Sequence, residues 1–318
     1  MATRTCKLKA SCDDLYLSVV ATEPQDIDIR DAVAVIQMVH GMAEHKERYI
    51  AMMEFLSTKG YICVMHDNRG HGQSVKDPSD LGYMYTGKAR GLVEDVLVVN
   101  KWIKQSYPGK QVYLYGHSMG SLIVRCYLKE HDDTIDGLIV CGSPSANSMA
   151  SMGKAMISAT ALLNGGNDKA WRKVVPLFTK MSTGQYAKGL PAGSSLNAWI
   201  CTDPKVVEAY DQDPLSGFPF TLNGYYSLMD LMVDCYSPKG YKVNSPRLPI
   251  WFIAGELDPC IVNKQSWDNA QAALRGVGYQ SVSCKMYPGM RHEIHNEVGK
   301  EGVWADIQHK IDSWAEEQ

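Results

Sequence analysis

One short segment limits the possible folds of this chain more than any other. Residues 111–115 form an apolar run that predicts a strand, Gly116-His117-Ser118-Met119-Gly120 follows at once, and residues 120–130 predict a helix. A strand that turns so tightly into a helix needs glycines beside the serine, because the backbone is strained there and the helix packs closely on the sheet. The segment therefore predicts a strand–turn–helix unit that presents the Ser118 hydroxyl at the end of a strand.

The same alternation of strand and helix runs through most of the chain. Short apolar runs predict buried strands, and amphipathic stretches of ten or more residues predict helices between them. This order is typical of an α/β protein with a parallel sheet covered by helices on both faces. The further predicted strands are 15–21, 32–39, 61–65, 137–141, 249–254 and 281–287, and the further predicted helices are 47–59, 92–105, 264–275 and 302–314.

The alternation is interrupted once. Residues 146–245 lack strong strand signals and carry mostly helical patterns. We therefore expect an α/β core made of residues 1–145 and 246–318, with residues 146–245 inserted as a helical cap. Met149, Met152 and Met156 recur at helical spacing within this insertion. We expect them to pack in the interior of the cap, with one face of the row lining a tunnel for an acyl chain.

A serine hydroxyl becomes a good nucleophile only when a base removes its proton, and that base is oriented by a carboxylate. In a fold of this kind the acid and then the histidine follow the serine in the chain, each in a loop after a strand. Asp258 follows the predicted strand 249–254, and His292 follows the strand 281–287. The sequence therefore predicts Ser118 as nucleophile, Asp258 as acid and His292 as base.

Two neighbouring residues are alternatives for these roles. Glu256 is a second candidate acid, but Pro259 disfavours helical geometry at Asp258 and so keeps Asp258 in a loop. His295 is a second candidate base. We favour His292 because it lies nearer the end of its strand, and we expect His295 behind the site or at the surface.

The negative charge that develops on a carbonyl oxygen needs two donors, usually backbone N–H groups. The N–H of Met119, directly after Ser118, is one candidate. The other lies in the loop His40-Gly41-Met42-Ala43-Glu44-His45, which follows the strand 32–39. We expect the N–H of Met42 to be the second donor.

Composition excludes several classes of function. With 32 Lys and Arg against 35 Asp and Glu, and no basic cluster, the chain is a poor candidate for nucleic-acid binding. No group of His, Cys, Asp and Glu has zinc spacing, so we expect no metal and no other cofactor.

Nine widely spaced cysteines are typical of free thiols in a reducing compartment. The sequence shows no secretory signal or membrane-spanning run, and we expect a cytoplasmic protein.

Taken together, these motifs resemble the monoacylglycerol lipase and lysophospholipase branch of the α/β-hydrolases. The resemblance implies the α/β-hydrolase fold, a mostly parallel eight-stranded sheet flanked by helices with an inserted helical cap. It also implies the catalytic roles of Ser118, Asp258 and His292 and the oxyanion roles of Met42 and Met119. The resemblance is weaker in the insertion: residues 213–218 look like a segment of bacterial members of the family, but residues 146–190 match no family pattern. The motifs that carry it are His40–His45 with Arg48-Tyr49, Asp67–Ser74, Gly116–Gly120, Gly255–Asp258 and His292–Glu297.

The resemblance implies a serine esterase or lipase that cleaves carboxylic esters with one acyl chain, such as monoacylglycerols or lysophospholipids, through an acyl-enzyme on Ser118. The same triad also serves peptidases, amidases, acyltransferases and C–C hydrolases, because the fold does not fix the reaction. We expect a small ester or lipid as the partner, with transient contact between the cap and a membrane surface. The sequence does not define an oligomeric state.

Overall fold

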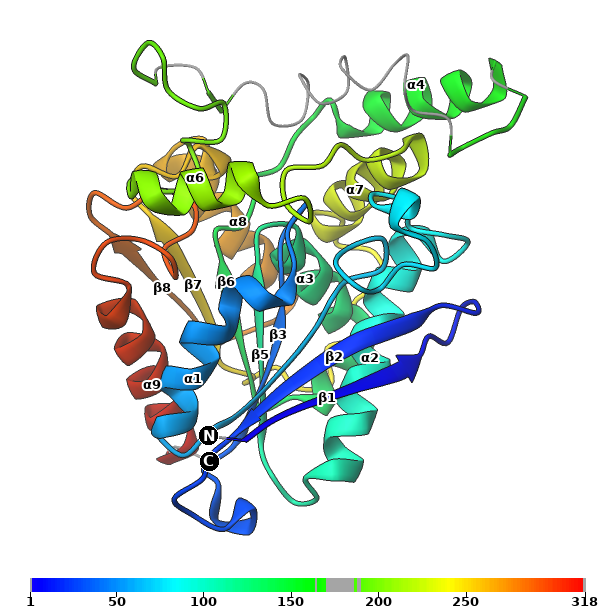
Figure 1. Ribbon diagram of the computed structural model, residues 1–318. Coiled ribbons are helices and arrows are strands. Elements are labelled where there is room, and N and C mark those ends of the chain that lie inside the picture. The colour runs from blue at the N-terminus through cyan, green and yellow to red at the C-terminus, as the bar shows by residue number, and fades with distance from the viewer. Residues whose placement is uncertain (1, 164, 170–185, 188–189, 317–318) are drawn as a thin grey trace.

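The computed structural model describes residues 2–163, 165–169, 186–187 and 190–316. Its centre is an eight-stranded sheet with the strand order β1-β2-β4-β3-β5-β6-β7-β8 (Figure 1). The predicted eight-stranded sheet is confirmed. The strands are β1 (Ala2–Lys9), β2 (Tyr16–Glu23), β3 (Val35–Val39), β4 (Ile62–His66), β5 (Val112–His117), β6 (Gly137–Cys141), β7 (Ile250–Gly255) and β8 (Val282–Tyr287).

The sheet is mostly parallel, as predicted. Strands β3 to β8 pair in parallel, whereas β2 is antiparallel to both β1 and β4. All the parallel strands therefore end at one edge of the sheet, where the loops that follow them meet. The strand β1 was not predicted, because it lies at the edge of the sheet and most of its side chains are polar and exposed.

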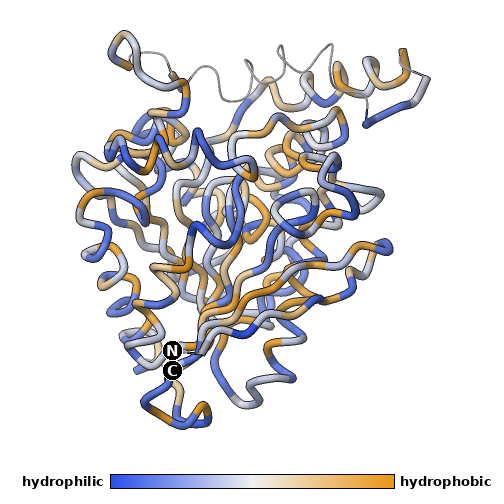
Figure 2. The backbone as a smooth tube through the Cα atoms, viewed as in Figure 1, coloured by the Kyte–Doolittle hydropathy of each residue, from blue (hydrophilic) through white to orange (hydrophobic). Residues whose placement is uncertain are grey.

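Helices cover both faces of the sheet. Side chains alternate between the faces along each central strand: in β4, Ile62 and Val64 pack in one core, and Cys63 and Met65 pack in the other. Figure 2 shows hydrophobic residues along the central strands and more hydrophilic ones on the outer helices. One face is covered by α1 (Ile50–Thr58) and α9 (Lys300–Glu316), and the other by α2 (Lys88–Ser106), α3 (Met119–His131) and α8 (Lys264–Val277).

The described part of residues 146–245 lies over the carboxyl ends of the parallel strands (Figure 1). Their described part contains three helices and no strand: α4 (Ala150–Leu163), α6 (Pro204–Gln212) and α7 (Leu222–Cys235). Helix α7 packs against α2 and α3 of the core, and α4 packs on α7.

The expected role of the methionine row is wrong. Met149 and Met152 are 51% and 48% exposed, and neither they nor Met156 lines the cavity described below. The face of α4 that packs on α7 instead carries the smaller side chains Ala150 and Gly153 together with Ile157. The methionine spacing predicted the helix correctly, but it predicted the wrong face as buried. Small residues allow two helices to pack more closely than methionines do, so the face with Ala150 and Gly153 lies against α7.

Two further expectations concern the whole chain. All nine cysteines are free thiols, as their number and spacing predict. Among the described helices, none is both long enough and apolar enough to cross a bilayer.

Candidate active site

Ser118 lies at the turn between β5 and α3, where the backbone is strained. Its φ and ψ angles are 53° and −119°, a conformation that residues with a side chain seldom adopt. The turn is held by a hydrogen bond from the Ser118 N–H to the Cys141 carbonyl oxygen at 3.0 Å. The hydroxyl consequently stands at the amino end of α3, where the helix dipole favours negative charge.

The two glycines of the turn are required by their surroundings. A Cβ atom on Gly116 would lie 2.6 Å from the Gly120 carbonyl oxygen, and one on Gly120 would lie 2.3 Å from the Val39 carbonyl oxygen. Helix α3 therefore sits directly against the end of β3. This contact brings Ser118 and the loop after β3 together.

Asp258 and His292 are in contact, although 34 residues separate them in the sequence. Nδ1 of His292 lies 2.9 Å and 3.0 Å from the two carboxylate oxygens of Asp258. Both side chains are buried. Burial disfavours the charged imidazole, but the charge and hydrogen bond of Asp258 outweigh it and raise the pKa of His292 well above its usual value. The pair therefore holds Nε2 of His292 as the basic nitrogen.

The alternative residues lie elsewhere. Glu256 is exposed in the loop after β7, where its carboxylate accepts a hydrogen bond from the Gly289 N–H. His295 is buried behind the site and stacks on Tyr49 with ring centroids 4.4 Å apart. Neither ring nitrogen of His295 has a hydrogen-bond partner within the described part of the chain. Burial lowers the pKa of His295 well below its usual value, so this ring is neutral.

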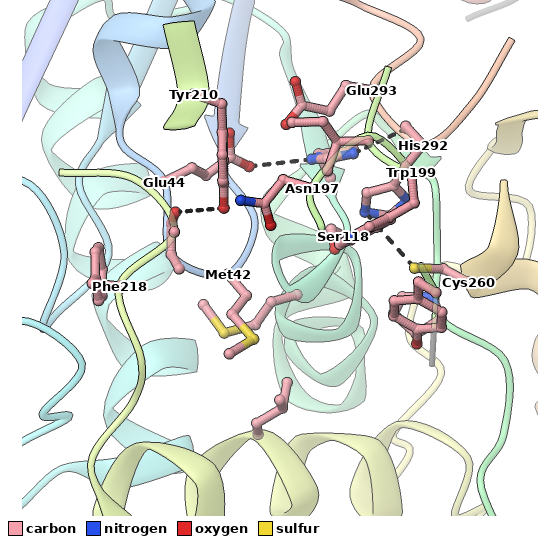
Figure 3. Close-up of a pocket in the computed structure, with 18 of the residues that line it drawn as sticks. Met42, Glu44, Ser118, Asn197, Trp199, Tyr210, Phe218, Cys260, His292 and Glu293 are labelled. Atoms are coloured by element: carbon pink, nitrogen blue, oxygen red, sulfur yellow. Dashed lines mark hydrogen bonds and ion pairs between the residues drawn. The ribbon is translucent and has the colours of Figure 1, made fainter. Parts of the chain in front are cut away.

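Ser118 and His292 open into one cavity of about 330 Å3 (Figure 3). In Figure 3 the His292 ring is drawn next to the Ser118 hydroxyl, and a dashed line joins it to Cys260. The Sγ atom of Cys260 lies 4.0 Å from Nε2 of His292. The indole of Trp199, from the inserted segment, packs on the other side of the imidazole with ring centroids 5.0 Å apart.

The candidate oxyanion donors lie on the two segments that the Gly120 contact brings together. Met119 is the first residue of α3, and Met42 lies in the loop after β3; both line the cavity. A Cβ atom on Gly41 would lie 3.0 Å from the Cβ of Ser118, so this loop runs directly beside the serine. The Ala43 carbonyl oxygen accepts hydrogen bonds from the N–H of Gly217 and the hydroxyl of Tyr210, which fix the loop to the inserted segment.

A buried polar network surrounds the His292 backbone, and no role was predicted from the sequence for its members His117, Glu44 and Arg48. Nε2 of His117 lies 3.2 Å from the His292 carbonyl oxygen. On its other side, Nδ1 of His117 lies 3.3 Å from the carboxylate of Glu44. Arg48 joins Glu44 to Glu293 through ion pairs of 2.7 Å and 2.6 Å. Burial opposes ionisation of Glu44, but His117 and Arg48 together keep its pKa well below the usual range. This network fixes the backbone that carries His292.

Within the part of the chain that the structure describes, two clusters of side chains have ligand atoms close enough to hold a metal ion. The first is Asp258, Cys260 and His292. The second is His117, Cys141 and His295, in which both nitrogens of His117 already have hydrogen-bonding neighbours.

The cavity is polar at one end and apolar over most of its wall. In Figure 3, Glu44, Asn197 and Glu293 are drawn on the side of the cavity where Ser118 and His292 lie, and most of the apolar lining residues come from the inserted segment. The polar lining includes Glu44, His117, Ser118, Asn147, Asn197, Cys260, His292 and Glu293. The apolar lining includes Leu196, Phe218, Pro219, Leu228, Met229 and Met232.

The chain is similar to several known proteins. The sequence model of the Hydrolase_4 family, described as serine aminopeptidase S33, matches residues 30–299. The chain is 26% identical over 287 residues to a monoglyceride lipase homolog of Monkeypox virus, with 88% of each chain covered. It is 26% identical over 277 residues to the phospholipase YtpA of Bacillus subtilis, covering 86% of this chain and 92% of that protein.

A solved structure extends the likeness to the fold. A thermostable carboxyl esterase from Bacillus coagulans, crystallised with glycerol, superposes with a TM-score of 0.86. It is 26% identical to this chain, and the superposition covers 99% of both chains. The similarity therefore includes the inserted segment as well as the sheet and its helices.

Proposed function

We propose that this chain, which belongs to the Hydrolase_4 family of α/β-hydrolases, cleaves its substrates through an acyl-enzyme on Ser118. It is a serine hydrolase of ester bonds in lipids, within the monoacylglycerol lipase branch. The observation that carries the proposal is the Asp258–His292 pair beside the strained Ser118, at the polar end of an apolar cavity.

The proposed reaction has two steps. The Ser118 oxygen attacks the ester carbonyl carbon while its proton passes to Nε2 of His292, and the N–H groups of Met42 and Met119 stabilise the oxyanion. The carbon–oxygen bond to the alcohol then breaks, and His292 returns the proton to the leaving alcohol. Water, activated in turn by His292, releases the fatty acid from Ser118. Asp258 keeps the imidazole in the required tautomer and stabilises it when charged.

The two ends of the cavity suggest the substrate class. An apolar wall from Met229 and its neighbours suits one acyl chain, and the side-chain amide of Asn197 suits the hydroxyl groups of a head group. We propose monoacylglycerols or lysophospholipids as substrates. The names of the relatives support this substrate class, because they include monoglyceride lipases and a phospholipase.

We propose that residues 146–245 act as a cap on a core of residues 1–145 and 246–318. The support is that the described part of this segment supplies most of the apolar cavity wall and lies over the strand ends (Figure 1).

The outer helix α4 exposes Met152 and Leu163, and Met149, directly before the helix, is exposed as well. We propose that these apolar side chains contact a lipid surface. Flotation with phosphatidylcholine vesicles should recover the wild type and lose a Met149→Ser/Met152→Ser variant. The control is Val33→Ser, which removes an exposed apolar side chain just before the amino end of β3, far from α4 in the fold. Equal recovery of all three proteins with the vesicles would reject the contact.

Substrate profiling tests the proposed function. Purified protein should hydrolyse monoacylglycerols, lysophospholipids and p-nitrophenyl esters, and Ser118→Ala should lower kcat on the order of 10^6-fold, the loss seen when a triad serine is removed. Because the family description names an aminopeptidase, amino-acid p-nitroanilides belong in the same panel. Faster cleavage of these amides than of any ester would favour the amidase alternative. Unchanged ester hydrolysis by Ser118→Ala would reject the acyl-enzyme.

A further inference from the structure

Cys260 is a residue of the site that the proposed reaction does not use. It follows Asp258 by two residues, lines the cavity and is almost fully buried. Its thiol faces Nε2 of His292 at 4.0 Å, the same nitrogen that would receive the serine proton. Nothing in ester hydrolysis requires a sulfur atom at this place.

We propose that Cys260 and His292 form a binding site for Zn2+, and that zinc bound there inhibits the enzyme reversibly. The ion would be an inhibitor from solution and not a cofactor of the reaction. Binding itself follows from the two ligands, whereas the loss of activity rests on the proposed role of His292 as base.

The geometry of the pair fits zinc. Bonds of about 2.3 Å to sulfur and about 2.0 Å to nitrogen, at a tetrahedral angle, place the two ligand atoms roughly 3.5 Å apart. The observed distance between Sγ and Nε2 is 4.0 Å, slightly longer than this ideal separation. A small rotation of the Cys260 side chain would bring the two atoms to the distance that zinc requires. Water completes the coordination from the cavity, because two protein ligands leave two tetrahedral positions open.

The surroundings of His292 are also those of a zinc ligand. A metal-binding histidine usually donates its other ring N–H to a carboxylate, which fixes the ring and makes it more basic. Asp258 already accepts that hydrogen bond from Nδ1 at 2.9 Å. Among the described residues, no lysine or arginine lines this cavity, whereas Glu44 and Glu293 do. Arg48, which pairs with both, offsets one of their two negative charges, so the remaining charge favours entry of a cation.

Binding of zinc to Cys260 releases one proton. A cysteine binds zinc as the thiolate, so the thiol proton of Cys260 must leave when the metal binds. Zinc replaces the thiol proton, which passes to solvent, and the lone pair of Nε2 is donated to the metal. That lone pair is then no longer available to remove the proton of Ser118. Zinc and catalysis therefore compete for one nitrogen atom.

The first test measures inhibition of ester hydrolysis. Zinc at micromolar concentration should inhibit the wild type, and EDTA should restore its activity. In Cys260→Ser the concentration for half inhibition, relative to that variant's own uninhibited rate, should rise by about tenfold or more, since even an outer partner of a zinc ligand contributes about that much. Cys284→Ser, which removes an exposed thiol on β8, is the matched control and should respond as the wild type does. Equal inhibition of Cys260→Ser and the wild type would overturn the proposal.

The second test reports binding without catalysis. Co2+ added to the wild type should give a thiolate-to-cobalt charge-transfer absorption that Cys260→Ser lacks and Cys284→Ser retains. Zinc should also protect Cys260 of the wild type from N-ethylmaleimide, as read by peptide mass spectrometry, which keeps the test valid if the variant misfolds. Absence of both effects would overturn the site, whereas their presence in a protein without esterase activity would reject the proposed function alone.

Discussion

The contact between α3 and the end of β3 gives a prediction that can be worked out from distances. Gly120→Ala would place a Cβ atom 2.3 Å from the Val39 carbonyl oxygen and 2.6 Å from the His40 carbonyl oxygen. Since ordinary contacts begin near 3.4 Å, the helix and the loop after β3 must separate by about 1.1 Å. This movement carries Met119 away from Met42, the two proposed donors to the oxyanion.

We expect two effects of this separation. A misplacement of about 1 Å in an active site costs roughly 10^2-fold in rate, so kcat on a p-nitrophenyl ester should fall by about that factor. Overpacking should lower the free energy of unfolding by about 1–3 kcal/mol, of which better helix propensity returns at most about 1 kcal/mol. Initial rates and urea denaturation measure the two effects.

A second glycine provides the control for this experiment. Gly302 lies in α9, and a Cβ atom there would meet nothing within 4 Å. Gly302→Ala should leave kcat unchanged and raise stability by up to about 1 kcal/mol. The reasoning is refuted if Gly120→Ala retains the kcat of the wild type, because the loop and the serine turn would then not depend on that contact.

Three further predictions follow from single contacts. Asp258→Asn removes the charge that raises the pKa of His292; because the base acts when neutral, the acidic limb of kcat/KM should move to lower pH, and kcat should fall on the order of 10^4-fold. A pH–rate profile checks this, and an unmoved limb would contradict it. Arg69→Met leaves Asp95 buried without its ion-pair partner, both side chains being almost inaccessible, and should cost about 3–5 kcal/mol of stability in urea denaturation. A loss below that range would show that Asp95 finds another partner. Met229→Trp should narrow the apolar part of the cavity and reduce kcat/KM for long p-nitrophenyl esters by about tenfold, with a smaller loss on the acetate. Parallel losses on all chain lengths would place the acyl chain elsewhere.

The sequence predicted the sheet and the order of the site residues because both depend on local patterns. Apolar runs mark buried strands, and residues directly after parallel strands must meet at one edge of the sheet. Asp258 and His292 are in contact for this reason. The strand β1 was missed because an edge strand with exposed polar side chains has no such pattern.

Other parts of the site depend on contacts between distant segments and left no local signal. Trp199 reaches His292 from the inserted segment, and Arg48 joins Glu44 to Glu293 across 245 residues of sequence. The sequence could give the helix that contains Met152 but not the side on which it packs, because that choice depends on the shape of α7. Cys260 has the same explanation, because no local pattern distinguishes it from the other cysteines until the fold places it against His292.

The central claim is that the Asp258–His292 pair activates Ser118 as the single nucleophile. Intact-protein mass spectrometry after reaction with a fluorophosphonate, with esterase activity followed in parallel, tests it most directly. The account predicts one adduct per chain on Ser118, activity lost in proportion to labelling, and no adduct on Ser118→Ala. Labelled protein that keeps its activity, or an adduct that persists on Ser118→Ala, would contradict it.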